Sequence, residues 1–284
     1  MKTKNLFTII LGTSLALGLF SCKKSDDVNT VDETEIESTF ELSEDQAVAE
    51  NLTEDAYDIM NEAVEAEGLS GAREPLVSAD RLLCATVTVT PASGFPRTIT
   101  IDFGNGCTAP GSNITRRGII QVVISDSLRR PGSTAVMTFN NYYVNNFKKE
   151  GTITWTNTST AGVRSWNRTV VDGRITAPGG RFWIHNSVKD VTQVAGVSTP
   201  RNLLDDAFEI EGQGTVRNSQ GRQRSFNILL PLHKQVICEN IDAGRIRFQG
   251  PNHVAVLDYG DGTCDRIAMI SIDGRPPRTI LLRN

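Results

Sequence analysis

The chain has 284 residues, of which 39% are hydrophobic and 22% are charged. This is the composition of an ordinary soluble globular protein, which excludes a chain disordered throughout, and the length suits one large β domain or two small ones. Charge is distributed unevenly. Residues 23–67 carry a net charge of −14, whereas residues 68–284 carry +8, and 21 of the 25 basic residues in this second part are Arg. An acidic N-terminal part therefore precedes a basic body rich in the cation that best fits carboxylates and phosphates.

The first 21 residues have the pattern of an export signal. Lys2 and Lys4 precede an apolar run over residues 6–20, which is shorter than the stretch of about 20 apolar residues that spans a membrane. The run ends at Ser21 and Cys22. We therefore expect residues 1–21 to be removed as a signal peptide.

The sequence around Cys22 carries a resemblance to a known class of proteins. LFSC at residues 19–22 resembles a bacterial lipobox with Cys22 as the lipidated residue, and KKSDD at 23–27 resembles the tag that directs lipoproteins of Bacteroidetes-type bacteria to the cell surface. The resemblance implies a surface lipoprotein of the outer membrane, held by acyl chains such as palmitate and facing the cell exterior. A plain secretory signal with an incidental Cys is the alternative.

The acidic part divides into two predicted segments. Residues 22–41 are polar and lack periodicity, which predicts a disordered tether. Residues 42–68 predict one amphipathic helix, with Ser43 and Gln46 as a capping box and Gly68 as its end. Its apolar stripe consists of Val48, Leu52, Ala56, Ile59 and Ala63.

The opposite face of this predicted helix is almost entirely acidic. We expect the stripe to pack on the following domain and the acidic face to be solvated. The alternatives are a helix that binds a partner, or one that shields the basic body electrostatically.

Residues 69–284 predict an antiparallel β domain. From about residue 82 onward, short segments rich in Val, Ile, Thr and aromatic residues alternate in polarity and are separated by Gly, Pro, Asn and Asp. This pattern is mainly β and favours a meander that forms either a sandwich or one strongly curled sheet. The sequences VDGR at 171–174 and IDGR at 272–275 predict short hairpin turns, because Asp-Gly fits the type I′ geometry.

Four cysteines besides Cys22 make an even number in an exported chain, which favours disulfides. Three pairings are possible. Reflection across a turn near residues 94–95 places Cys84 opposite Cys107, and reflection across residues 250–251 places Cys238 opposite Cys264. We therefore predict that one disulfide closes the open end of each hairpin.

The two predicted hairpins also share a sequence motif, DFGNGC at 102–107 and DYGDGTC at 258–264. The glycines supply positive φ, and Asp102 and Asp258 are placed to bond the following amides as Asx turns. We interpret residues 82–125 and 236–274 as similar modules, which suggests an internal duplication. Calcium binding is a weaker alternative for the second loop, with candidate ligands Asp258, Asp261 and Asp265.

The sequence contains no pattern typical of an enzyme. His185, His233 and His253 lack the neighbouring ligands that a zinc site needs, and we expect His185 to be a core or rim residue. The motifs of serine hydrolases, P-loop proteins and dinucleotide-binding proteins are missing. Glu209 and Glu211, on one strand face, are more readily explained as solvated acids than as a glycosidase pair. We predict no cofactor.

The basic body suggests possible ligands. Arg-rich stretches at 115–118, 128–132, 217–224 and 245–248 are candidate patches for lipopolysaccharide phosphates or an anionic glycan, whereas the export signal argues against nucleic acid. The three tryptophans are more typical of core than of a sugar-stacking surface: Trp155, Trp166 and Trp183.

The sequence therefore favours a lipid-anchored cell-surface protein with a non-enzymatic binding or structural role. An outer-membrane protein is a candidate partner for it. A glycan- or polyanion-binding component of an uptake system is the first alternative. A hydrolase of unknown type is the second.

Overall fold

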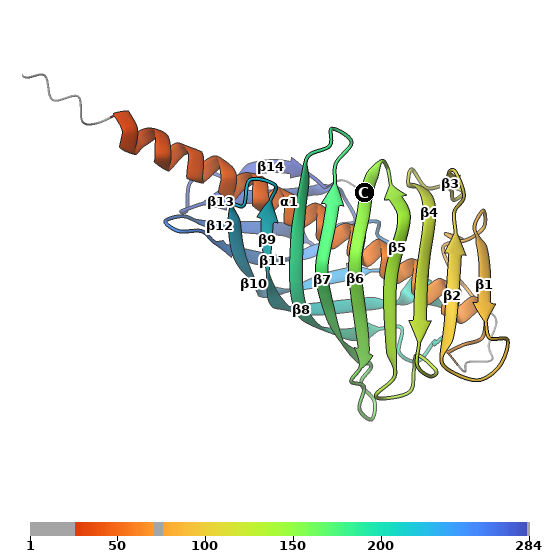
Figure 1. Ribbon diagram of the computed structural model, residues 1–284. Coiled ribbons are helices and arrows are strands. Elements are labelled where there is room, and N and C mark those ends of the chain that lie inside the picture. The colour runs from red at the N-terminus through yellow and green to blue at the C-terminus, as the bar shows by residue number, and fades with distance from the viewer. Residues whose placement is uncertain (1–25, 71–75, 283–284) are drawn as a thin grey trace, which may run out of the picture.

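The structure, a computed structural model, describes residues 26–70 and 76–282, with side chains from residue 32 onward. It confirms a mainly β fold. One helix, α1 (Asp26–Ala66), is followed by 14 strands that form a single antiparallel sheet (Figure 1). The sheet is a meander in which strands follow one another in chain order, except that β3 pairs only with β4.

The strands and one short 3-10 helix have the following bounds: β1 Thr86–Thr90, β2 Arg97–Asp102, β3 Cys107–Thr108, β4 Thr115–Ile124, β5 Thr134–Val144, β6 Phe147–Asn157, β7 Ser165–Thr176, β8 Phe182–Ala195, η1 Leu203–Asp205, β9 Ala207–Asn218, β10 Gln223–Gln235, β11 Ala243–Gln249, β12 Val254–Asp261, β13 Ile267–Ile272 and β14 Arg278–Leu281.

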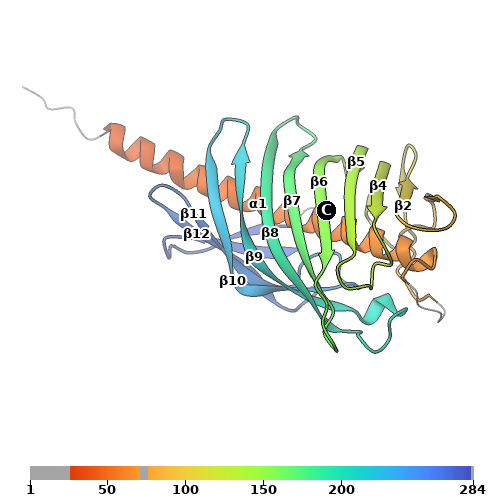
Figure 2. The ribbon, with the colours of Figure 1, turned by 60° about the horizontal axis from the view of Figure 1, so that its bottom comes forward.

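The sheet is strongly curled, so of the two predicted forms the curled sheet is the correct one. Two views show α1 running along the trough of the sheet, with β4–β8 on one side and β10–β13 on the other (Figures 1 and 2). Bulges help the strands to bend. At one of them Gly151 has φ +105°, and a Cβ there would lie 2.4 Å from the carbonyl oxygen of Asp172.

The two Asp-Gly sequences have different structures. Asp273 and Gly274 both have positive φ in the turn between β13 and β14, as predicted. The prediction for residues 171–174 is wrong, because Asp172 and Gly173 lie inside β7 at a bulge opposite β8. Asp and Gly adopt positive φ readily, and this backbone conformation occurs at bulges as well as in hairpin turns.

The helix begins well before the predicted start. It runs from Asp26 through the segment predicted to be a tether, and Ser43 lies inside it with its hydroxyl donating to the Thr39 carbonyl oxygen rather than forming a cap. Buried Ile36 packs in the core, and the acids of this segment bond the far end of the sheet: Glu37 pairs with Arg278 at 2.7 Å. These partners follow more than 180 residues later, so local composition could not reveal them.

The predicted apolar stripe of the helix is confirmed: all five of its members are buried. The helix packs against inward-facing side chains of the sheet. Tyr57, beside the stripe, contacts the aromatic rings of the strands: Trp155, Trp166 and Phe208. The core of the domain therefore surrounds α1 and is not confined to the space between strands. No helix in the described residues is long and apolar enough to cross a membrane.

The two predicted modules lie near opposite ends of the strand order, but the curl brings their loops together. Ser112 Oγ donates to Glu239 Oε1 at 3.4 Å, and both residues line one small pocket. No strand pairing between β1 and β14 closes the sheet within the described residues.

Candidate functional site

The acidic face of α1 is buried, which corrects the expectation that it is solvated. The curled sheet encloses the helix and places cations opposite its carboxylates, as the electrostatic alternative had suggested. Buried acids on the helix include Asp45, Glu50, Glu54, Asp55, Asp58, Glu62 and Glu65, and buried cations on the strands include Arg116, Lys149, Arg168, Lys189, Arg224 and Lys234. A buried charge is costly unless it is paired, so this interface is the main polar feature of the interior.

Five groups form the centre of the interface. The Arg168 guanidinium, 1% exposed, donates to Glu54 and lies 3.8 Å from Glu50, which also accepts from Lys189. The Lys149 amine donates to the Thr53 hydroxyl at 3.0 Å instead of to a carboxylate. The centre therefore contains two carboxylates, Glu50 and Glu54, two cations paired with them, and the Lys149 amine, which is not bonded to a carboxylate.

The pKa values of this cluster follow from burial and charge. Burial lowers the pKa of Lys149 to about 7, against the attraction of Glu50. Burial alone would raise the pKa of Glu50, but Lys189 and Arg168 bring it below its ordinary value. The cluster therefore comes close to neutral when Glu50 is ionised and Lys149 releases its proton.

Ion pairs continue toward the C-terminal end of α1. Arg116 Nε donates to Asp55 Oδ2 at 3.0 Å, and Arg129 pairs with Glu65 at 2.5 Å. Arg116 and Arg129 belong to two of the predicted surface patches. These side chains bind the chain's own helix, so they do not form a free surface for a polyanion.

His185 lies in the core, as expected, on β8 beside this cluster. Its side chain is 1% exposed and neither ring nitrogen has a hydrogen-bond partner among the described residues. Burial, and then the nearby Lys149, lower the pKa of His185 to about 3. The imidazole is therefore neutral in the folded protein over the physiological range.

His185 should make the fold sensitive to acid. The unfolded chain binds a proton at this side chain near pH 6.5 and the folded chain only near pH 3, so stability falls as pH drops through this window, by about 1.4 kcal/mol per unit. Between pH 7 and 5, the wild-type protein should lose about 2 kcal/mol more than His185→Leu, in urea titrations. Equal losses in the two proteins would contradict this assignment.

The other two histidines bond carboxylates. His233 Nδ1 lies 2.5 Å from Asp242, and His253 lies 2.6 Å from Asp273 and 2.7 Å from Asp32 of α1. Hydrogen bonding to Asp273 raises the pKa of His253. No group of three His, Cys, Asp or Glu side chains suited to a metal ion occurs within the described residues.

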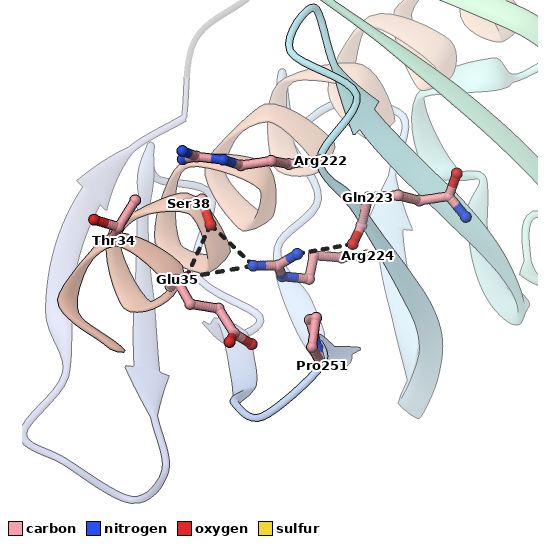
Figure 3. A pocket seen from close by; sticks show the side chains of 7 residues that line it. All are labelled: Thr34, Glu35, Ser38, Arg222, Gln223, Arg224 and Pro251. Carbon is pink, nitrogen blue, oxygen red and sulfur yellow. Dashed lines mark hydrogen bonds between the residues drawn. The ribbon is translucent and has the colours of Figure 1, made fainter. Parts of the chain in front are cut away.

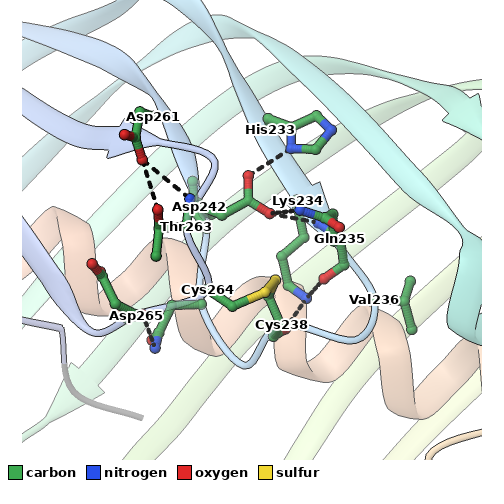
Figure 4. The surroundings of a disulfide bond; sticks show 12 residues. His233, Lys234, Gln235, Val236, Cys238, Asp242, Asp261, Thr263, Cys264 and Asp265 are labelled. Atoms are coloured by element: carbon green, nitrogen blue, oxygen red, sulfur yellow. Dashed lines mark hydrogen bonds and ion pairs between the residues drawn. A yellow bond between two sulfur atoms is a disulfide. The ribbon is translucent and has the colours of Figure 1, made fainter.

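Both predicted disulfides are confirmed. Cys84 bonds Cys107, and Cys238 bonds Cys264, with Cα atoms 5.6 and 5.2 Å apart. Figure 4 shows the second bond beside Lys234, whose amine donates to the carbonyl oxygen of Cys238 at 2.5 Å. Because Lys234 also lies 3.5 Å from Asp58, the disulfide loop is fixed to the helix.

The repeated motifs form the predicted Asx turns. Asp102 accepts from the amide of Gly104 at 2.8 Å, and Asp258 from the amide of Gly260 at 3.0 Å. Gly104 and Gly260 have positive φ, as does Gly262, whereas Gly106 does not.

The three candidate calcium ligands bond their own loops. Asp258 also accepts from Arg245 Nε at 2.7 Å, Asp261 accepts from the Thr263 hydroxyl at 2.8 Å (Figure 4), and Asp265 accepts from the amide of Ile267 at 2.8 Å. The structure does not bring their carboxylates together as one ligand group.

Other candidate residues lie as expected. Glu209 and Glu211 are exposed on β9, and all three tryptophans are buried in the core, so they form no platform for stacking a sugar. Cys22 lies outside the described residues. The cations opposite the helix were not individually predicted; the charge asymmetry between residues 23–67 and 68–284 was the signal that could have found them.

Comparisons with protein-family models, with curated proteins and with solved structures find no match for this chain.

Proposed function

We propose that the chain is a lipid-anchored protein of the outer membrane, facing the cell exterior, with a non-enzymatic binding or structural role. The observation that carries this proposal is the position of α1. It begins at Asp26, four residues after the predicted lipidation site Cys22, and continues along the trough of the sheet. A lipid on Cys22 would then hold the folded domain close to the membrane, without the long tether that the sequence suggested.

The interior supports a scaffold role. His253 and most of the buried charged side chains bond groups within the protein and stabilise the contact between helix and sheet. The bonding capacity of these side chains therefore serves to stabilise the fold. The outer face of the sheet and the end of the molecule near the start of α1 then remain for partners, such as an outer-membrane protein or an anionic glycan.

Metabolic labelling tests the anchor. Cells that express the wild-type chain with labelled palmitate should yield a labelled protein in the outer membrane, because acyl chains on Cys22 insert there. Cys22→Ala should lose the label and leave the membrane fraction, while Cys84→Ala, as the matched control, should keep the label. A wild-type chain that is secreted without label would contradict the proposal, and protease treatment of intact cells would show whether the domain faces outward.

A further inference from the structure

A hollow of about 460 Å³ lies where the first turns of α1 meet the β9–β10 and β11–β12 hairpins (Figure 3). Its lining includes two arginines, two hydroxyl residues and one carboxylate. The lining residues are Thr34, Glu35, Ser38, Arg222, Gln223, Arg224 and Pro251.

Arg224, like Lys149, is a buried cation of the concave face that bonds no carboxylate among the described residues. Its side chain is 3% exposed, yet all of its hydrogen bonds go to uncharged oxygens, including the hydroxyls of Thr39 at 2.8 Å and Ser38 at 2.9 Å. Arg116 and Arg168, by contrast, bond carboxylates of the helix. Arg224 therefore has no direct ion pair with the described residues, and the carboxylate that acts on its charge is that of Glu35.

Arg222 adds a second positive charge at the same hollow. It is exposed, and its guanidinium makes no hydrogen bond or ion pair with the described residues. Residues two apart on an extended chain point to the same side, and Figure 3 shows both arginine side chains beside the hollow. The two guanidinium groups thus lie next to one open space.

The single carboxylate of the hollow, Glu35, acts electrostatically on Arg224 but forms no direct ion pair with either arginine among the described residues. Glu35 accepts from the backbone amide and side-chain amide of Asn252, both at 2.7 Å, and from the amide of His253 at 3.3 Å. It is thereby directed to the β11–β12 turn. Two arginines and one carboxylate leave the hollow with an excess of positive charge, with hydroxyl groups near it, and this is the chemistry that recognises phosphate.

We propose that the hollow lined by Arg222 and Arg224 binds a phosphate group, with Arg222 as the arginine free to pair with it. Where the phosphate comes from depends on the proposed function, because the hollow lies near the predicted anchor. Thr34 is eight residues from Asp26, or about 12 Å along the helix axis at 1.5 Å per residue. If Cys22 is acylated, the headgroup phosphate of an anionic lipid is one source, and a soluble phosphate is the other.

Titration calorimetry on the mature full-length chain in nonionic micelles tests the proposal. One arm uses inorganic phosphate and the other dihexanoyl phosphatidylglycerol, each added to wild type, Arg222→Gln and Arg97→Gln. Arg222→Gln removes the free guanidinium and should weaken binding by about tenfold, as expected for losing a charge-assisted pair. Arg97→Gln removes the same charge from the β1–β2 end, far from the start of α1, and should bind like wild type.

Binding of both compounds, weakened about tenfold in Arg222→Gln but not in Arg97→Gln, establishes recognition of the phosphate group itself. Binding of the lipid alone assigns a headgroup site, and binding of inorganic phosphate alone assigns a soluble ligand. No binding of either, or an equal affinity in wild type and Arg222→Gln, overturns the proposal, as does an equal loss in Arg97→Gln. This result is independent of palmitate labelling. If the chain is not labelled but binds phosphate through Arg222, the proposed lipid anchor is wrong and the proposed phosphate site is supported.

Discussion

Replacing Arg168 by Met should destabilise the protein by about 3–5 kcal/mol, the range for breaking a buried ion pair by removing one partner. Arg168 is 1% exposed and is the cation between Glu50 and Glu54 on successive turns of α1. Without it, Lys189 remains for Glu50, but the buried Glu54 side chain is left with no cation bonded to it among the described residues. Urea titration at pH 7 measures the loss.

Two further variants show whether this loss comes from the buried charge. Arg130→Met removes an arginine from an exposed pair with Asp126, and should change stability by about 0.5 kcal/mol or less. Arg168→Met combined with Glu54→Gln should recover part of the loss, because the second change removes the uncompensated carboxylate. If Arg168→Met lost no more than Arg130→Met, the ion pairs between helix and sheet would not be important for stability.

Local patterns predicted much of the fold. Alternation of polarity indicated an antiparallel meander, and reflection across two turns gave both disulfides, because neighbouring strands of a meander are also neighbours in sequence. The turns at Asp102 and Asp258 followed for the same reason. Each of these predictions depends on residues that lie within about 30 positions of one another.

The helix shows why other features could not be predicted. Acidic residues usually face water, so the rule that predicts secondary structure from periodicity assigned them to a tether and a solvated face. Whether Glu54 is buried depends on Arg168, 114 residues further along the chain. Such pairs become visible only when the curl of the sheet is known, although the opposite net charges of the two parts of the chain indicated that they attract.

The candidate phosphate site was predictable from the local sequence in one respect and not in another. Arg222 and Arg224 stand in an Arg-rich stretch that the sequence marked as a possible patch. The sequence did not show that Arg224 would be buried against Ser38 and Thr39 of the helix, or that Arg222 would lie beside it with no ion pair to the described residues. The functional assignment therefore depends on the position of α1 as much as the fold does.

Hydrogen exchange along α1 tests most directly the claim that this helix is the core of the β domain. In the full-length chain at neutral pH, amides between Leu42 and Val64 should exchange as slowly as those of β6 and β7, since both open only when the whole domain unfolds. Their protection should be on the order of a thousandfold or more, as expected for a stably folded domain. Exchange of this segment within minutes, while β6 and β7 remain protected, would show that α1 leaves the trough readily and would contradict the account.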